Sequence, residues 1–208
     1  KKVFITGHTG FKGSWMSLWL QKLGTNLIGF SKSIPTEPSL FKLANVQQGM
    51  LSLFGDIREY KNLEEILRKH KPDIIIHMAA QSLVKKSYEN PIETFTTNIF
   101  GTMNIFEAVR QIQNPCLVLN VTSDKCYENT GKTSGYIESD PIGGYDPYSS
   151  SKGCSELITS SYRNSFFNSK QNENKILIAS VRAKAFPIFI SPTSSPTIEP
   201  TIFFSFPA

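Results

Sequence analysis

Cysteine, histidine and long apolar runs are scarce in this sequence of 208 residues. The three cysteines, Cys116, Cys126 and Cys154, are odd in number and widely spaced, and no CxxC pair is present. Because a disulfide framework needs paired cysteines, this usage is typical of a reducing compartment, and we expect a cytoplasmic protein. No apolar run approaches the roughly 20 residues that a membrane-spanning helix needs. No membrane partner is therefore expected.

Metal-ligand motifs and blocks of basic residues are also missing. His8, His70 and His77 show neither HExxH nor any paired spacing, so no metal site is predicted. His77 lies inside an apolar run and is interpreted as a core or strand-end residue. The net charge is only +5, and no block of Lys or Arg stands out beyond Lys85-Lys86. A nucleic-acid partner is therefore not expected.

Short apolar runs alternate with segments of helical period from the first residue to about Arg182. The expected strands are 3–6, 26–30, 50–54, 73–77, 116–121 and 175–181, and the expected helices are 12–23, 62–69, 92–111 and 148–167. Residues 31–49 are polar and contain two prolines, so we expect a long connection there. Strands that alternate with helices predict an α/β fold of the Rossmann type, a doubly wound parallel sheet covered on both faces.

The pattern changes at about Ala183. Residues 184–208 contain five prolines and many Ser and Thr residues among scattered Phe and Ile. Each proline removes a hydrogen bond from a helix or a strand ladder. We therefore expect one domain over residues 1–183 and an irregular tail over residues 184–208.

A GxxGxxG motif, GHTGFKG at residues 7–13, stands between the first expected strand and the first expected helix. Glycines let the backbone approach a pyrophosphate closely, and the helix N-terminus attracts it with unpaired N–H groups and the positive end of the dipole. The motif predicts a dinucleotide site that includes Gly7, Thr9, Gly10, Phe11, Lys12 and Gly13. A tight turn without a ligand is the alternative.

Two further segments follow expected strands at positions that suit a dinucleotide. Asp56, next to Ile57, can accept a hydrogen bond from an adenine amino group, although a turn or cap aspartate is the alternative. Ala79-Ala80-Gln81 has small side chains that leave room for ribose and phosphates, although plain close packing is the alternative. Both segments are expected to belong to the cofactor site.

The pattern with the most chemistry is Tyr148-Ser149-Ser150-Ser151-Lys152, preceded by Ser123 at a strand end 25 residues earlier. Tyr148 and Lys152 are four residues apart and share one helix face. Lys152, together with a nicotinium ring, is expected to lower the pKa of Tyr148 so that it acts as a general base. Ser123 can hydrogen-bond the same substrate hydroxyl. Cys126 and Cys154, close to this site in sequence, are interpreted as packing residues and not as nucleophiles.

Five strings carry a resemblance to a known family. They are GHTGFKGSWMSLW (7–19), PTEPSLF (35–41), HMAAQSLVKKS (77–87), VTSDKCYEN (121–129) and GGYDPYSSSKGCSE (143–156). The chain resembles the extended short-chain dehydrogenase/reductases, and within them the CDP-glucose 4,6-dehydratase family, over residues 1–183. The last two strings are long and more specific than the signature of the superfamily.

The resemblance implies an NAD-dependent lyase that converts CDP-glucose to CDP-4-keto-6-deoxyglucose, with NAD taking a hydride from sugar carbon 4 and returning it to carbon 6. Tyr148 would be the base at the 4-hydroxyl, assisted by Lys152 and Ser123. Asp124 would be the acid for the departing hydroxyl and Lys125 the base, once it has lost its own proton. Related dehydratases carry Asp-Glu where this chain carries Asp124-Lys125. This difference favours CDP-glucose over dTDP-glucose.

The resemblance also assigns residues to neighbouring sites and implies a partner. Asn98 and Gln81 would contact the cofactor, and Gln81 and Ser82 would lie near the sugar nucleotide, together with Ser123 and Tyr148. A homodimer is common in the family and is expected if the protein is intact. The product would serve the synthesis of a surface polysaccharide.

Two departures from the family keep alternatives open. No acidic residue follows the second expected strand to bind the adenosine 2′-hydroxyl, and Lys12 and Lys32 would suit a 2′-phosphate, so the residues alone do not decide between NAD and NADP. After Ala183 the family's Gly-Asn-Val loop and its smaller substrate domain do not follow. We expect a truncated or frame-shifted sequence whose sheet has an uncovered edge or face. A catalytically incomplete dinucleotide-binding fragment, a dTDP-glucose dehydratase and a sugar-nucleotide epimerase are the alternatives.

Overall fold

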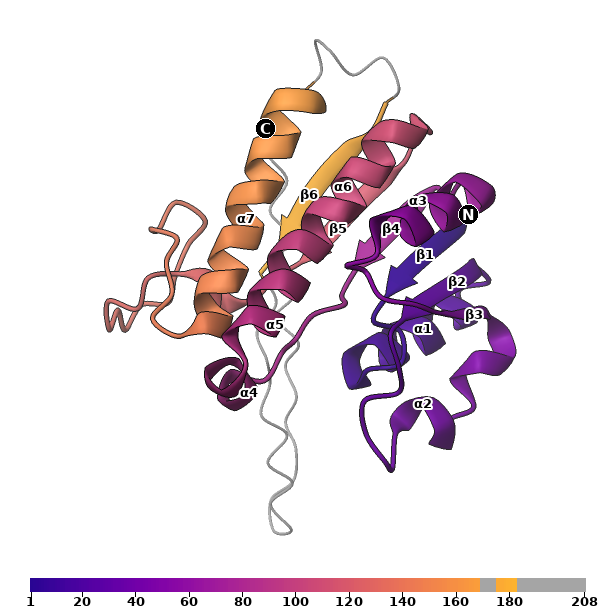
Figure 1. The fold of residues 1–208 in the computed structure, drawn as a ribbon, viewed down its shortest axis with the longest axis horizontal. Helices are drawn as coiled ribbons and strands as arrows, with labels where there is room; N and C mark the ends of the chain where they lie inside the picture. Colours follow the sequence, from indigo (N-terminus) through magenta and orange to yellow (C-terminus); the bar gives the residue numbers. More distant parts are fainter. Residues whose placement is uncertain (169–174, 183–208) are drawn as a thin grey trace.

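The computed structural model describes residues 1–168 and 175–182. Six strands in these ranges form one sheet in the order β3-β2-β1-β4-β5-β6, with all neighbours parallel (Figure 1). They are β1 (Lys2–Thr6), β2 (Asn26–Ser31), β3 (Leu51–Phe54), β4 (Ile74–His77), β5 (Leu117–Val121) and β6 (Leu177–Val181). This doubly wound order confirms the predicted Rossmann-type α/β fold.

The helices that connect these strands are α1 (Phe11–Lys22), α2 (Leu40–Leu43), α3 (Tyr60–His70), α4 (Val84–Glu89), α5 (Pro91–Phe95), α6 (Gly101–Ile112) and α7 (Pro147–Phe166). Residues 31–49 form the expected long connection, but it contains two short elements that the sequence did not predict, α2 and the 3-10 turn η1 (Val46–Gly49). Ser39 caps α2 by accepting a hydrogen bond from the Lys42 backbone N–H, and Phe41 is buried. One buried aromatic residue and one cap therefore suffice for a short helix in a polar segment. The sequence did not predict α4 either.

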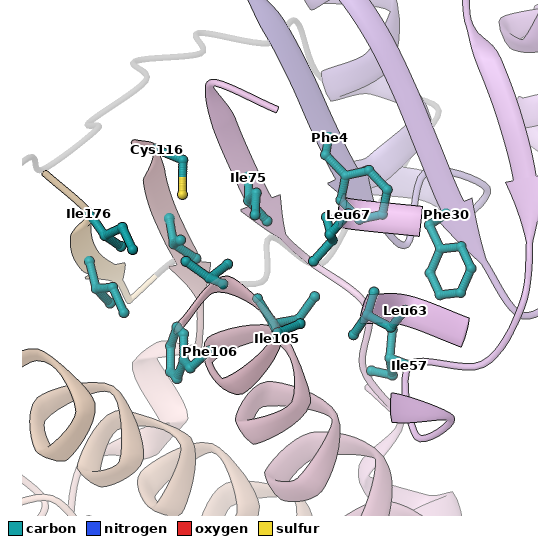
Figure 2. Close-up of a cluster of buried hydrophobic side chains, with 14 of the residues drawn as sticks. Phe4, Phe30, Ile57, Leu63, Leu67, Ile75, Ile105, Phe106, Cys116 and Ile176 are labelled. Carbon is teal, nitrogen blue, oxygen red and sulfur yellow. The ribbon is translucent and has the colours of Figure 1, made fainter. Parts of the chain in front are cut away.

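The main hydrophobic core lies between the sheet and one layer of helices. Figure 2 shows the large buried side chains that α3 and α6 contribute to it, including Leu63, Leu67, Ile105 and Phe106, with Phe4, Phe30 and Ile75 from the strands. Each of these seven side chains is less than 2% exposed. Burial of apolar surface at about 25 cal/mol per Å² makes this layer the principal source of stability. It fixes the sheet on which the candidate site is built.

On the opposite face, α1 packs through small side chains. Its buried residues are Gly13, Ser14, Ser17 and Leu20. Trp15 and Trp19, whose spacing predicts the helix, lie on its solvent side and are 55% and 57% exposed. The small residues bring the helix axis close to the sheet, so the aromatic residues are left on the far side. Further along this face, Leu117 and Leu177, which pair in register, are also exposed.

The helix expected over residues 92–111 is divided. A π-turn, η2 (Thr96–Phe100), separates α5 from α6 and carries the buried Asn98. The extra residue of a π-turn re-aims a side chain inside an otherwise regular helix, and such turns are frequent at functional sites. The expected boundary at Ala183 and the tail 184–208 lie outside the described residues. Of the helices described, none has both the length and the apolarity to cross a membrane.

Candidate functional site

The candidate site lies where β1 and β4 meet, because the chain leaves these neighbouring strands in opposite directions across the sheet. In such folds ligands bind at the carboxyl ends of the strands at this point. The turns that follow the two strands are bonded together: the Thr6 hydroxyl oxygen accepts hydrogen bonds from the backbone N–H groups of Met78 and Ala79, both at 3.0 Å. The glycine-rich turn and the Ala79-Ala80-Gln81 segment therefore form one unit.

The spacing of the glycines is required by the close approach of backbone to backbone. Gly7 has φ of +77°, and a Cβ atom there would lie 2.9 Å from the backbone N of Ala79. A Cβ atom on Gly13 would lie 2.0 Å from the Gly7 carbonyl oxygen. Gly10 has more room and is the N-cap of α1, with no side-chain cap and no acidic residue in the first turn. The N-terminus of α1 is therefore open to an anion.

The other predicted residues of this turn differ in exposure. Thr9 is buried, and its hydroxyl donates to the Ser33 carbonyl oxygen at 2.7 Å, which ties the turn to the end of β2. Phe11 and Lys12 are exposed in the first turn of α1. Lys12 lies close enough to Lys152 for its charge to act on that residue. The cofactor contacts assigned to these three side chains stay predictions.

Asp56 carries a carboxylate held by two cations. Arg58 donates to it from Nε and Nη2, and the Lys32 ammonium lies 3.5 Å from Oδ2. The hydrogen bonds from Arg58 are the main cause that lowers the pKa of Asp56 to about 2. Sequence reasoning missed Arg58, which only its proximity to Asp56 could have suggested. The Ile57 side chain belongs to the main core, so only its backbone remains for the predicted cofactor contact.

Asn98 and Gln81 lock the segment after β4 to the rest of the domain. Asn98 Oδ1 accepts from the Gln81 backbone N–H at 2.8 Å, and its Nδ2 donates to the Gln81 carbonyl oxygen and to Ser151 Oγ. The Gln81 side-chain amide bonds Leu83 and Thr94. Both side chains therefore hold the protein itself together. Their assigned contacts to cofactor and substrate stay predictions, as do those of the half-buried Ala79 and Ala80 and the exposed Ser82.

The residues of the second predicted cluster gather at the carboxyl end of β5. The Ser123 hydroxyl donates to Asp124 Oδ1 at 3.1 Å and is hydrogen-bonded with Tyr148. Lys152 is buried, and its Nζ donates to the Val121 carbonyl oxygen at 3.3 Å. Lys125 is the exception, since its side chain is exposed to solvent. Tyr148, Ser123, Asp124 and the lysine of α7 are thus brought together by the fold.

The pKa expected for Tyr148 is wrong for the protein alone. Burial raises the pKa of Tyr148 above its ordinary value, and the hydrogen bond with Ser123 is what acts in the opposite direction. Burial also lowers the pKa of Lys152 to about 8, against the attraction of Glu156. Burial is the largest cause, because a phenolate loses its solvation inside the protein.

Buried histidines and cysteines around the site are structural. His77 bonds Thr6 at 2.8 Å and Thr102 at 3.2 Å, and burial lowers its pKa to about 3, so its interpretation as a core residue is confirmed. Cys126 is buried and burial raises its pKa to about 12, which supports its interpretation as a packing residue, while the interpretation of Cys154 stays a prediction. Within residues 1–168 and 175–182, no group of His, Cys, Asp or Glu side chains could hold a metal ion.

Comparison with known proteins gives this geometry a family. The family model described as GDP-mannose 4,6 dehydratase matches residues 4–174. The chain belongs to this family, within the extended short-chain dehydrogenase/reductases. Among curated relatives of this dehydratase family member, CDP-glucose 4,6-dehydratase of Salmonella typhimurium is 52% identical over 184 residues, which are 88% of this chain and 51% of the relative. CDP-paratose 2-epimerase of Salmonella typhi is 30% identical, over 79% of this chain and 54% of the relative.

Solved structures agree with this membership. The UDP-glucose 4-epimerase of Thermus thermophilus, in complex with NAD, is 26% identical with a TM-score of 0.72, over 88% of this chain and 54% of the epimerase. This dehydratase family member spans about half the length of the relatives that it matches. The activity, substrate and partners of a whole enzyme are therefore matters of proposal.

Proposed function

We propose that residues 1–183 form the NAD-binding and catalytic part of a CDP-glucose 4,6-dehydratase. The observation that carries the proposal is the gathering of Tyr148, Ser123 and Lys152 at the end of β5, on the sheet whose β1 is followed by the open N-terminus of α1. The 52% identity to the Salmonella typhimurium enzyme supports the reaction and the nucleotide. Three free cysteines, two of them buried, are consistent with a cytoplasmic location.

The residues around the glycine-rich turn fit NAD. The backbone N–H groups at the start of α1, at Phe11, Lys12 and Gly13, would hold its pyrophosphate, and the Asp56 carboxylate would accept a hydrogen bond from the adenine. When bound, NAD supplies the hydride acceptor and donor of the reaction, and its ring adds a positive charge. Lys32 is already paired with Asp56. It is therefore less available to a 2′-phosphate, which supports NAD over NADP.

The catalytic roles follow from what each side chain can donate or accept. Tyr148, as phenolate, would take the proton of the sugar 4-hydroxyl, while Ser123 hydrogen-bonds the same oxygen. The Lys152 ammonium would stabilise the phenolate from the same face of α7. Asp124, bonded to Ser123, would protonate the departing 6-hydroxyl. Lys125, as the neutral amine, would accept the proton of carbon 5, and its exposed side chain would have to be covered by substrate.

The resemblance implies that dTDP-glucose enzymes carry Asp-Glu at these two positions. The Asp124-Lys125 pair of this chain therefore favours CDP-glucose over dTDP-glucose as the substrate. A second candidate is a dinucleotide-binding chain without turnover. The open N-terminus of α1 fits this candidate equally, because it suits the binding of a dinucleotide whether or not turnover follows.

A homodimer through α7 is the proposed assembly. Leu157 on α7 is 61% exposed and Phe100 on the adjoining η2 is 54% exposed. Two such apolar groups on packed elements suit a self-complementary surface. Light scattering after size exclusion should give twice the mass of the chain, and a single chain mass at micromolar concentration would contradict the proposal.

Turnover tests the proposed function. The chain is incubated with NAD⁺ and, in separate reactions, CDP-, dTDP-, UDP- and GDP-glucose, and the product is identified by the mass loss of one water. We expect product from CDP-glucose, reduced by a factor on the order of 10² to 10⁴ in Tyr148→Phe, since the general base is removed. NAD⁺ binding without product from any sugar would favour the second candidate.

A further inference from the structure

Glu156 is a buried carboxylate, one helical turn beyond Lys152 on α7, to which neither the sequence motifs nor the proposed catalytic roles assign a task. Tyr148, Lys152 and Glu156 follow one another at intervals of four residues, so they lie along one helix face. The Glu156 side chain is only 6% exposed. A carboxylate at this depth is costly unless it is paired, so its partners decide what it does.

Those partners come from the ends of two neighbouring strands. Glu156 Oε1 accepts a short hydrogen bond from the hydroxyl of Thr122, the residue that follows β5. Its Oε2 accepts from Ser180 Oγ of β6 at 2.8 Å and from Arg182 Nη2 at 3.3 Å. The Thr122 backbone N–H in turn donates to the Val181 carbonyl oxygen at 2.9 Å. One carboxylate thus joins α7 to both strands.

Arg182 carries the connection outward to the loop that precedes α7. Its Nη1 donates to the Tyr127 hydroxyl at 2.7 Å and to the Glu138 carbonyl oxygen at 3.2 Å, and the guanidinium carbon lies 4.7 Å from the centre of the Tyr127 ring. Arginine can bond and stack at once because its guanidinium is planar. The ion pair with Glu156 therefore orders residues on both sides of Ser123.

Lys152 and Glu156 hold adjacent residues of the same strand end. Lys152 bonds the Val121 carbonyl oxygen and Glu156 bonds the Thr122 side chain, immediately before Ser123. Four charged or titratable groups act on Lys152 or respond to it: Glu156 on α7, Lys12 at the start of α1, Cys126 in the 3-10 turn η3 (Asp124–Cys126), and His77 of β4. Of these, Glu156 is the one carboxylate, and it opposes the effect of burial on Lys152.

We propose that Glu156 is a positioning residue that holds the ends of β5 and β6 against α7, so that Ser123 faces Tyr148, and whose negative charge, one helical turn away, stabilises the buried Lys152 ammonium. The proposal rests on the proposed function for its catalytic meaning. Its two physical parts, the bonded strand ends and the charge on Lys152, are properties of the protein without substrate.

The titration of Lys152 tests the charge effect without any turnover. Lysine labelled with ¹³C at Cε is followed by NMR against pH, with Lys152→Met to assign the signal. The wild-type midpoint is expected near 8. In Glu156→Gln, which keeps the shape but removes the charge, we expect the midpoint to fall by on the order of one pH unit, the usual effect of losing a nearby opposite charge. An unchanged midpoint in folded Glu156→Gln would overturn the proposal.

Three controls separate charge from loosening of the structure. Glu156→Asp retains the charge and should restore most of the wild-type midpoint. Ser180→Ala removes one hydrogen bond but no charge and should leave the midpoint in place. Glu107→Gln removes a carboxylate from another ion pair, with Arg110 on α6, and should have no effect on Lys152. A shift in Ser180→Ala as large as that in Glu156→Gln would contradict a charge effect.

A second variant covers the case in which Glu156→Gln does not fold. Glu156→Gln with Arg182→Met replaces the ion pair as a unit, which buried pairs often tolerate. Because Glu156 acts on Lys152 more strongly than Arg182 does, the midpoint should still fall. A midpoint at the wild-type value in this double variant would equally overturn the proposal.

The pH dependence of turnover then shows whether the charge of Glu156 affects catalysis. If wild type turns over CDP-glucose, the Lys152-linked limb of kcat/KM should move to lower pH in Glu156→Gln by the same amount as the NMR midpoint. If wild type does not turn over any sugar, the proposed function fails while the lysine titration still decides the role of Glu156.

Discussion

The N-terminus of α1 lies at the cofactor half of the candidate site and the N-terminus of α7 at the catalytic half. The two helix ends differ in how they are capped. The N-cap of α1 is Gly10, with no side-chain cap and no acidic residue in the first turn. The N-cap of α7 is Asp146, whose carboxylate accepts from the Ser149 backbone N–H at 3.0 Å, with Pro147 in the first turn. One helix end is open to an external anion, and the other is closed by the protein's own carboxylate.

The difference indicates how the two halves work. The open end is made of backbone atoms held in place by glycines, so it suits a ligand that brings its own negative charge. The closed end fixes the first turn of α7 and with it Tyr148, so it suits a side chain that must be held still. Binding and chemistry are thus assigned to different helix ends on one sheet.

The variant with the largest expected effect adds a methyl group where Gly13 and Gly7 approach each other. In Gly13→Ala the new methyl would lie 2.0 Å from the Gly7 carbonyl oxygen, a contact between the helix and its own turn. We expect a loss of unfolding free energy of about 3 kcal/mol or more, measured by urea denaturation. Gly24→Ala is the control: its φ is +71° but no atom lies within 4 Å, so a cost of about 1 to 2 kcal/mol is expected. Equal losses in the two variants would show that the turn is not closely packed.

Two buried histidines beside the glycine-rich turn, His8 and His77, make stability depend on pH. Burial lowers the pKa of His8 from 6.5 to about 4. The unfolded chain therefore takes up a proton near pH 6.5 that the folded chain refuses until about pH 4, so stability falls as pH falls through this range, by about 3 kcal/mol for His8. His77 acts in the same direction, to about pH 3.

Chemical denaturation at pH 7 and pH 4.5 measures this loss. Asp56, whose pKa is lowered from 3.8 to about 2, contributes chiefly below this range. His8→Gln should reduce the loss, whereas His70→Gln, at a half-buried position, should leave most of it. The same loss in His8→Gln as in wild type would contradict the assignment to His8.

The smallest expected effect on stability comes from removing the N-cap of α7. Asp146→Ala removes the cap of α7 and should cost about 1 kcal/mol of stability. Asp146→Asn, whose amide oxygen can still accept from Ser149, should cost much less. Thermal unfolding of the three proteins measures both. Equal losses in Asp146→Asn and Asp146→Ala would mean that the carboxylate charge, and not the cap, matters at this position.

The parts of the site that are local in sequence were predictable. Gly7, Gly10 and Gly13 are closely spaced at a strand-to-helix junction, and Tyr148 and Lys152 lie within one turn of helix, so their spacing and context indicated the candidate site. The doubly wound parallel sheet followed from apolar runs that alternate with helices. Each of these signals depends on residues that are close together in the chain.

What the sequence could not predict depends on long-range contacts. Arg182 meets Glu156 across 26 positions, and Asn98 bonds Ser151 across 53. The raised pKa of Tyr148 results from burial, which no spacing reveals. The sequence did not predict which face of α1 is exposed, for a similar reason. Trp15 and Trp19 have the period of a buried face, but Gly13 and Ser17 lie nearer to the sheet.

The most direct test of the open and closed helix ends is a titration of the ¹⁵N-labelled chain with NAD⁺, followed by backbone amide shifts, with NADP⁺ in parallel. Our account predicts the largest shifts at Gly10, Phe11, Lys12 and Gly13, smaller ones near Asp56, little change at Asp146–Ser149, and weaker binding of NADP⁺. Shifts concentrated at the start of α7, or none at millimolar NAD⁺, would contradict it.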